Sequence, residues 1–78
     1  MYALVNVEKF VQDNADRLGD RAEGILARAK EHAGGTGVIS GGAVKDIMGD
    51  DDLTHEFSQT VTDDPEHMRI GLEAINKA

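Results

Sequence analysis

Hydrophobic residues recur at helical spacing through the first thirty or so positions of the chain. At 100° per residue they fall within one sector about 100° wide, and most charged residues lie on the opposite side. The pattern predicts a long amphipathic helix over about residues 6–33, with Asn6 as its N-cap and Gly34 just past its end. The apolar stripe of this helix contains Leu4, Val7, Val11, Leu18, Ile25, Leu26 and Ala29.

Gly19 leaves a second interpretation of this segment open. Asp20 and Glu23 have the spacing of a capping box, which predicts two helices separated near Gly19. The stripe keeps its phase across Gly19, and this favours one unbroken helix. Such a helix of about 28 residues would be roughly 42 Å long, whereas a domain of this chain length has a diameter of about 30 Å. An unbroken helix would therefore extend past its domain, and a neighbouring chain would have to cover its stripe.

The pattern changes after residue 33. Residues 34–42 include five glycines, which predicts a flexible linker. In the acidic half, residues 43–78, we expect two or three short helices. The first ends at Gly49, and the acidic residues 50–52 favour the start of the next. The inner faces of these two helices are predicted to consist of Val44, Ile47, Met48, Leu53, Phe57 and Val61.

The last third of the chain can be interpreted in two ways. Asp64 before Pro65 and Glu66 is a strong helix start, because proline is favoured at the first helical position. The inner face of that helix is predicted to contain Met68, Leu72 and Ile75. Apolar residues also alternate here and β-formers precede them, so a β-hairpin over about 56–75 is the alternative. The predicted fold is a single small domain over 1–78, mostly α, with an α+β form as the alternative.

Composition and charge narrow the function classes. The chain has no cysteine, which excludes disulfides and thiolate metal sites. Its formal net charge is −7, and most of that charge lies in residues 43–78, which argues against direct binding to a phosphate backbone. No apolar run is long enough for a membrane span. We therefore expect a protein that stays in the cytoplasm, or a virion component assembled there.

The candidate chemical motifs are all incomplete. Gly37 and Gly42 have the spacing of a phosphate-binding loop, but Ala43 stands where its lysine belongs. Asp52 with His55, and Asp63 with His67, have a spacing compatible with a shared metal ligand set, and nothing in the sequence brings the two pairs side by side. No serine or threonine has a recognisable base. The sequence thus predicts no cofactor, no metal and no catalytic site, and we expect the protein not to be an enzyme.

One resemblance to a known family covers the N-terminal half. The segment AEGILARAKEHA (residues 22–33), the glycine-bounded Thr36–Gly37 and the amphipathic segment after it resemble the start of tail-completion and head–tail joining proteins of long-tailed bacteriophages. In that family a long helix packs on a sheet and the subunits form a ring in the virion neck. The resemblance implies a structural role in a virion, and it assigns no functional residue.

Two functional hypotheses follow. The first is a non-catalytic protein–protein interaction or assembly module, a homo-oligomer or part of a larger assembly, that uses the apolar stripe as its interface. The second is a small acidic regulator or inhibitor, antitoxin-like or a nucleic-acid mimic, that binds a basic partner. Its acidic docking face would contain Asp50, Asp51, Asp52, Asp63, Asp64 and Glu66.

Overall fold

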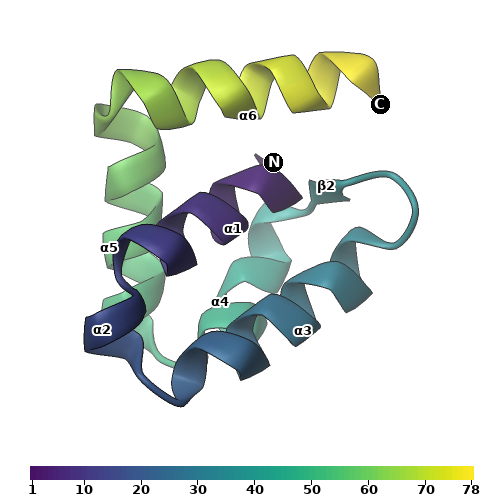
Figure 1. Ribbon diagram of the computed structural model, residues 1–78. Coiled ribbons are helices and arrows are strands. Elements are labelled where there is room, and N and C mark those ends of the chain that lie inside the picture. The colour runs from purple at the N-terminus through teal and green to yellow at the C-terminus, as the bar shows by residue number, and fades with distance from the viewer.

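Helices make up most of the chain, as the hydrophobic periodicity predicts (Figure 1). The computed structural model describes residues 1–78. The elements in chain order are β1 (Tyr2–Ala3), α1 (Leu4–Asp13), α2 (Ala15–Leu18), α3 (Arg21–Ala33), β2 (Val38–Ile39), the 3-10 turn η1 (Gly41–Ala43), α4 (Val44–Met48), α5 (Asp51–Asp63) and α6 (Pro65–Lys77).

The prediction of one unbroken helix over residues 6–33 is wrong. The chain forms α1, α2 and α3 there, with breaks at Asn14 and Gly19. The Asn14 side-chain amide donates to the Phe10 carbonyl at 2.8 Å, so a side chain stabilises the end of α1. Gly19 has a φ of +54°, in the left-handed region that glycine adopts without a steric penalty. The helix also begins earlier than predicted, at Leu4, and Asn6 lies inside it.

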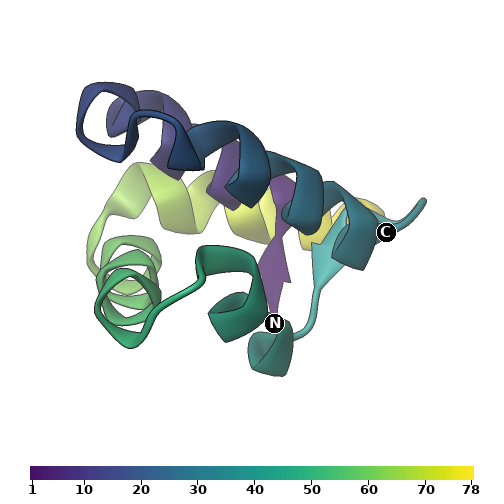
Figure 2. The ribbon, with the colours of Figure 1, turned by 90° about the horizontal axis from the view of Figure 1, so that it is seen from below.

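The two breaks explain why a continuous apolar stripe does not correspond to one continuous helix. They let α3 turn back beside α1, so that the two helices lie next to each other in one layer (Figures 1 and 2). The stripe keeps its phase across Gly19 because both helices face the same core. The longest extent of the molecule is 31 Å, well short of the roughly 42 Å that an unbroken helix would need. No part of the stripe extends past the domain.

The predicted glycine-rich linker contains secondary structure. Within residues 34–42, β2 pairs antiparallel with β1, with Tyr2 opposite Ile39 and Ala3 opposite Val38. Ile39 is fully buried, so this segment contributes to the core. The short pairing ties the chain terminus beside α1 to the segment that follows α3.

The helices of the acidic half are where the capping residues predict them. The Asp50 carboxylate accepts from the Leu53 backbone N–H at 2.7 Å, and the Asp64 carboxylate accepts from the Glu66 N–H at 2.9 Å. Each satisfies a backbone donor that the first turn of a helix leaves free. Residues 56–75 are helical on both sides of Asp64, so the alternative β-hairpin does not occur.

The core lies between two layers, with α1 to α3 above it and α4 and α5 below it in Figure 2, while α6 crosses one end of the molecule (Figure 1). All three aromatic residues meet there: the ring centroids of Phe10 and Phe57 are 5.3 Å apart in an edge-to-face arrangement, and Tyr2 lies 5.2 Å from Phe57. Residues of α1 to α5 and β2 form this hydrophobic cluster, and no residue of α6 belongs to it. The attachment of α6 therefore has a different basis.

Candidate functional site

The inner face of α6 is not the one that the sequence predicts. Met68 and Leu72, expected to be inside, are 43% and 56% exposed. The buried residues of α6 are His67 and Gly71, and Ile75 is only partly buried. The helix is thus turned by roughly one residue from the predicted orientation, since adjacent residues lie about 100° apart. Its largest apolar side chains flank the buried strip instead of filling it.

A buried polar contact determines this orientation. Asn6 on α1 is 1% exposed, and so is His67. The Asn6 side-chain oxygen accepts from the Ala3 backbone N–H at 3.3 Å, and its Nδ2 donates to the His67 carbonyl at 2.8 Å. The same Nδ2 lies 3.3 Å from His67 Nδ1. Because buried polar groups must be hydrogen-bonded, Asn6 fixes which face of α6 turns inward.

Gly71 allows this close approach of α6 to α1. A Cβ atom built on Gly71 would lie only 2.5 Å from the Asn6 side-chain oxygen. Any other residue would push the Asn6 amide out of its hydrogen bonds or move the helix. His67 and Gly71 are one helical turn apart, so both face Asn6 from the same strip of α6.

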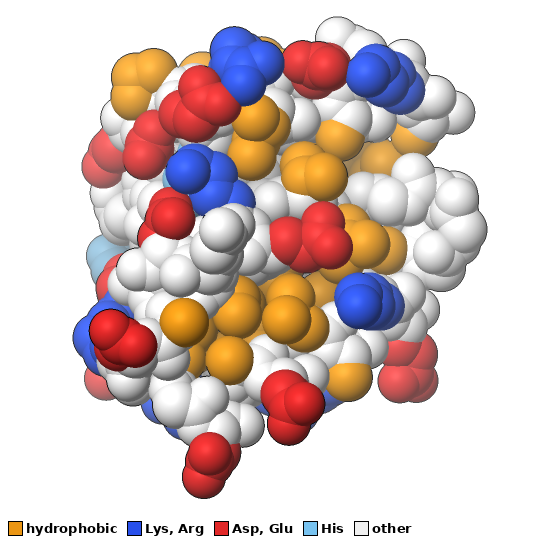
Figure 3. Space-filling model, in the orientation of Figure 1, with side chains coloured by type: hydrophobic (Ala, Val, Ile, Leu, Met, Phe, Trp, Pro, Cys, Tyr) orange, Lys and Arg blue, Asp and Glu red, His pale blue; other side chains and the backbone are white.

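An open groove lies between α1 and α6, next to the contact of Asn6 with His67 and Gly71. Its apolar floor is formed by Val5 from α1 and by Ile70 and Ala74 from α6, and its volume is about 430 Å³. Val5 is 36% exposed. Figure 3 shows hydrophobic side chains gathered between the two helices, below a row of alternating charges on α6. The α1–α6 groove, as we call it, is lined by Val5, Arg69, Ile70, Glu73, Ala74 and Lys77.

The charged rim of the groove is neutralised within α6. Arg69 pairs with Glu66 and, at 3.3 Å, with Glu73, and Lys77 pairs with Glu73 at 3.1 Å. The hydrogen bond from Arg69 lowers the pKa of Glu66 and raises the pKa of Arg69 itself. All of these groups are solvent-exposed, and such pairs contribute little to stability. Their effect is to leave the groove with little net charge in an acidic protein.

The residues of the predicted apolar interface lie mainly in the domain's own core. Five of them are buried and two, Leu4 and Leu26, are partly buried against the core. The break at Gly19 accounts for this, because it folds the stripe onto α4 and α5 instead of leaving it to a neighbour. The five buried residues are Val7, Val11, Leu18, Ile25 and Ala29. Their side chains are covered by the domain itself and are not accessible to a partner.

The six carboxylates of the predicted acidic docking face do not form one surface. Residues 50–52 lie at the start of α5 and residues 63–66 at its end, about 18 Å apart at the rise of an α-helix. Asp50 accepts from the Leu53 N–H and pairs with Arg21 at 2.6 Å, and both contacts lower its pKa. Asp51 pairs with Lys45, Glu66 pairs with Arg69, and Asp64 caps α6. Within this set, Asp52 and Asp63 have neither an ion pair nor a capping contact.

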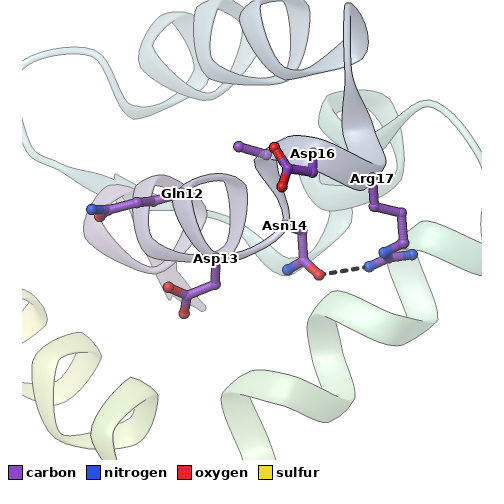
Figure 4. Close-up of a pocket in the computed structure, with 6 residues that line it drawn as sticks. Gln12, Asp13, Asn14, Asp16 and Arg17 are labelled. Atoms are coloured by element: carbon purple, nitrogen blue, oxygen red, sulfur yellow. Dashed lines mark hydrogen bonds between the residues drawn. The ribbon is translucent and has the colours of Figure 1, made fainter.

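A second hollow, at the break after α1, is polar. Its volume is about 220 Å³, and the side chains around it belong to residues 12–17 (Figure 4). Arg17 donates to the Asn14 side-chain oxygen at 2.9 Å and also pairs with Glu56 on α5. Asp13 pairs with Lys9 at 3.3 Å. The pair between Arg17 and Glu56 fastens this turn to α5.

The remaining candidate ligands stay dispersed. His32 contacts Asp46 at 2.7 Å, His55 is exposed and His67 is buried. No group of three or more residues that could hold a metal ion is brought together. None of the helices combines the length and the apolar character needed to cross a bilayer.

Comparison with known proteins gives no relative. No protein-family profile, no curated protein and no solved structure matches this chain.

The sequence did not predict that Asn6, His67 and Gly71 meet: it predicts Asn6 as a helix cap and His67 as a candidate metal ligand, and it gives Gly71 no role. Two of them carry a local signal: Asn6 is an asparagine within the apolar run of α1, and Gly71 is a glycine in the middle of a helix, where it costs about 1 kcal/mol relative to alanine. A glycine kept there has a packing reason in this structure. The sequence could not predict the groove beside them, because the groove depends on which face of α6 turns toward α1.

Proposed function

We propose that the protein is a non-catalytic protein–protein interaction module whose contact surface is the α1–α6 groove. The observation that carries this proposal is the open apolar floor formed by Val5, Ile70 and Ala74. In this chain most apolar side chains are covered, yet α6 leaves its largest ones outside the core. Apolar grooves with a polar rim are typical of surfaces that bind another protein.

The occupant that we propose is an amphipathic helix of a different protein. Two helices lying side by side form a groove into which the apolar side chains of a third helix fit. The rim carries little net charge, so it does not select strongly for charge in the partner. Each copy of this chain has a net charge of −7, and the mutual repulsion opposes pairing of two copies. The resemblance to head–tail joining proteins makes a virion one setting for such a partner.

A matched pair of substitutions tests the proposal. Val5→Asp places a charge in the groove, whereas Leu72→Asp places one on an exposed apolar position of α6 outside the groove. Cross-linking in source cells identifies the partner, and calorimetry with the purified partner measures affinity for the two variants. We expect Val5→Asp to weaken binding at least about tenfold, equivalent to about 1.4 kcal/mol. Leu72→Asp should leave the affinity unchanged, and circular dichroism checks that both variants fold.

The same experiment distinguishes the other hypotheses. A groove interface should respond weakly to salt, because its contacts are apolar. Equal binding by Val5→Asp and the unchanged protein would reject the groove. A steep loss of binding with salt, together with a loss in Asp52→Asn/Asp63→Asn, would favour the acidic regulator. A mass of twice the chain in light scattering would identify a second copy as the occupant.

A further inference from the structure

The attachment of α6 to the rest of the domain is polar at its centre. The hydrophobic cluster and the apolar residues packed against it include no residue of α6. The buried residues of α6 are His67 and Gly71, and both lie against Asn6. Because no residue of α6 belongs to the hydrophobic cluster, the release of α6 would leave that cluster intact.

The hydrogen bonds of Asn6 determine which tautomer the neutral His67 ring adopts. A backbone N–H can only donate and a backbone carbonyl can only accept, so the contacts with Ala3 N and His67 O set the orientation of the Asn6 amide. Asn6 Nδ2 therefore faces His67 Nδ1, 3.3 Å away, as a donor. His67 Nδ1 must accept, and the neutral ring carries its proton on Nε2.

We propose that the contact between Asn6 and His67 is a proton-sensitive latch, and that protonation of His67 releases α6 from α1 and β1. A proton on Nδ1 would place two donors, Asn6 Nδ2 and His67 Nδ1, against each other in a buried site. The Asn6 amide cannot rotate to offer its oxygen without breaking its bonds to Ala3 and to the His67 carbonyl. This inference does not rest on the proposed function.

The charges around His67 act in both directions. Asp64 and Glu66, at the start of α6, and Asp13 on α1 favour the charged ring, whereas Lys9 on α1 disfavours it. The strand β1 has no charged side chain, and Asp63 ends α5 directly before the cap. Burial is the largest influence and lowers the pKa of His67 below the ordinary value of 6.5.

The direction of the pH effect follows from this lowered pKa. Well above pH 6.5 the ring is neutral with α6 docked or released, so the latch is at full strength. As the pH falls below 6.5, the released helix takes up a proton that the docked helix does not, and docking weakens. The loss continues until the pH falls below the pKa of the docked state. Because one proton is involved, the docking equilibrium changes at most about tenfold per pH unit.

Hydrogen exchange of the whole chain at pH 7.5 and pH 5 tests the latch. After correction for intrinsic exchange rates, we expect protection of the α6 amides to fall, by at most about thirtyfold between pH 6.5 and pH 5, and that of α3 to change far less. His67→Asn retains an acceptor near the position of Nδ1 and cannot take up the proton, so its α6 protection should not depend on pH. His55→Asn, at an exposed histidine, should behave as the unchanged protein does.

Each contrary result overturns the inference. These results are an equal loss in α3 and α6, no loss in α6, or the same loss in His67→Asn as in the unchanged protein. If His67→Asn does not fold, nitrogen NMR of the histidine rings in the unchanged protein decides the question. We expect the proton of His67 on Nε2 at pH 7.5, and its titration should coincide with the opening of α6. A proton on Nδ1 at neutral pH would reject the latch.

Discussion

Helices α3 and α6 have the same length of 13 residues and both are amphipathic, yet they are attached to the domain in opposite ways. In α3 the stripe that the periodicity predicts is the one that is buried, with Ile25, Ala29 and Ala33 in the core. In α6 the predicted stripe lies outside, and a histidine and a glycine are buried. Apolar periodicity thus predicts that a helix forms, and a specific contact decides which face turns inward.

The largest expected effect is the difference in the free energy of unfolding between truncating a large apolar side chain in α3 and truncating one in α6. Ile25 is fully buried, and Ile25→Ala should lower the free energy of unfolding by about 3 kcal/mol through lost burial and the cavity that remains. Leu72→Ala removes a comparable side chain from α6 and should change it by less than about 0.5 kcal/mol. Urea unfolding followed by circular dichroism measures both. Similar losses in the two variants would mean that the outer face of α6 is covered.

The second expected effect concerns the contact that holds α6. Asn6→Ala leaves a ring nitrogen, a backbone carbonyl and a backbone N–H without their partner, and should cost about 2 kcal/mol. Asn14→Ala removes an amide at the partly exposed break after α1 and should cost less than about 1 kcal/mol. The same unfolding measurement compares them, and hydrogen exchange should show α6 opening first in Asn6→Ala. Uniform loss of protection in both layers would argue against a separable α6.

These differences show which parts of the fold the sequence could predict. Caps are local, so Asp50 and Asp64 marked the starts of α5 and α6 correctly. The break at Gly19 was visible only as an alternative, because the phase of the stripe is the same for one helix and for two helices on one core. Asn6 and His67 are 61 residues apart in the chain, and neither residue indicates its partner. The orientation of α6, and with it the groove, therefore could not be predicted.

The smallest expected effect concerns two helical glycines, for which replacement by alanine should change the free energy of unfolding in opposite directions. Alanine is favoured over glycine in a helix by about 1 kcal/mol. In α3, a Cβ on Gly24 would meet only the end of the Arg28 side chain, at 3.1 Å, so Gly24→Ala should stabilise the protein by about 0.5 kcal/mol. In α6, a Cβ on Gly71 would displace the Asn6 amide, and the lost hydrogen bonds should outweigh the gain and leave a net cost of about 1 kcal/mol.

Thermal unfolding of the two variants beside the unchanged protein measures this difference. Because Gly24→Ala and Gly71→Ala are the same chemical change in helices of equal length, helix propensity cancels between them, and the remainder reports the contact with Asn6. In the Asn6→Ala background the clashing amide is absent. There, Gly71→Ala should stabilise the protein relative to Asn6→Ala alone by most of the difference in helix propensity. A stabilising effect of Gly71→Ala alone would show that α6 does not approach α1 closely. That result would also contradict the attachment of α6 through Asn6.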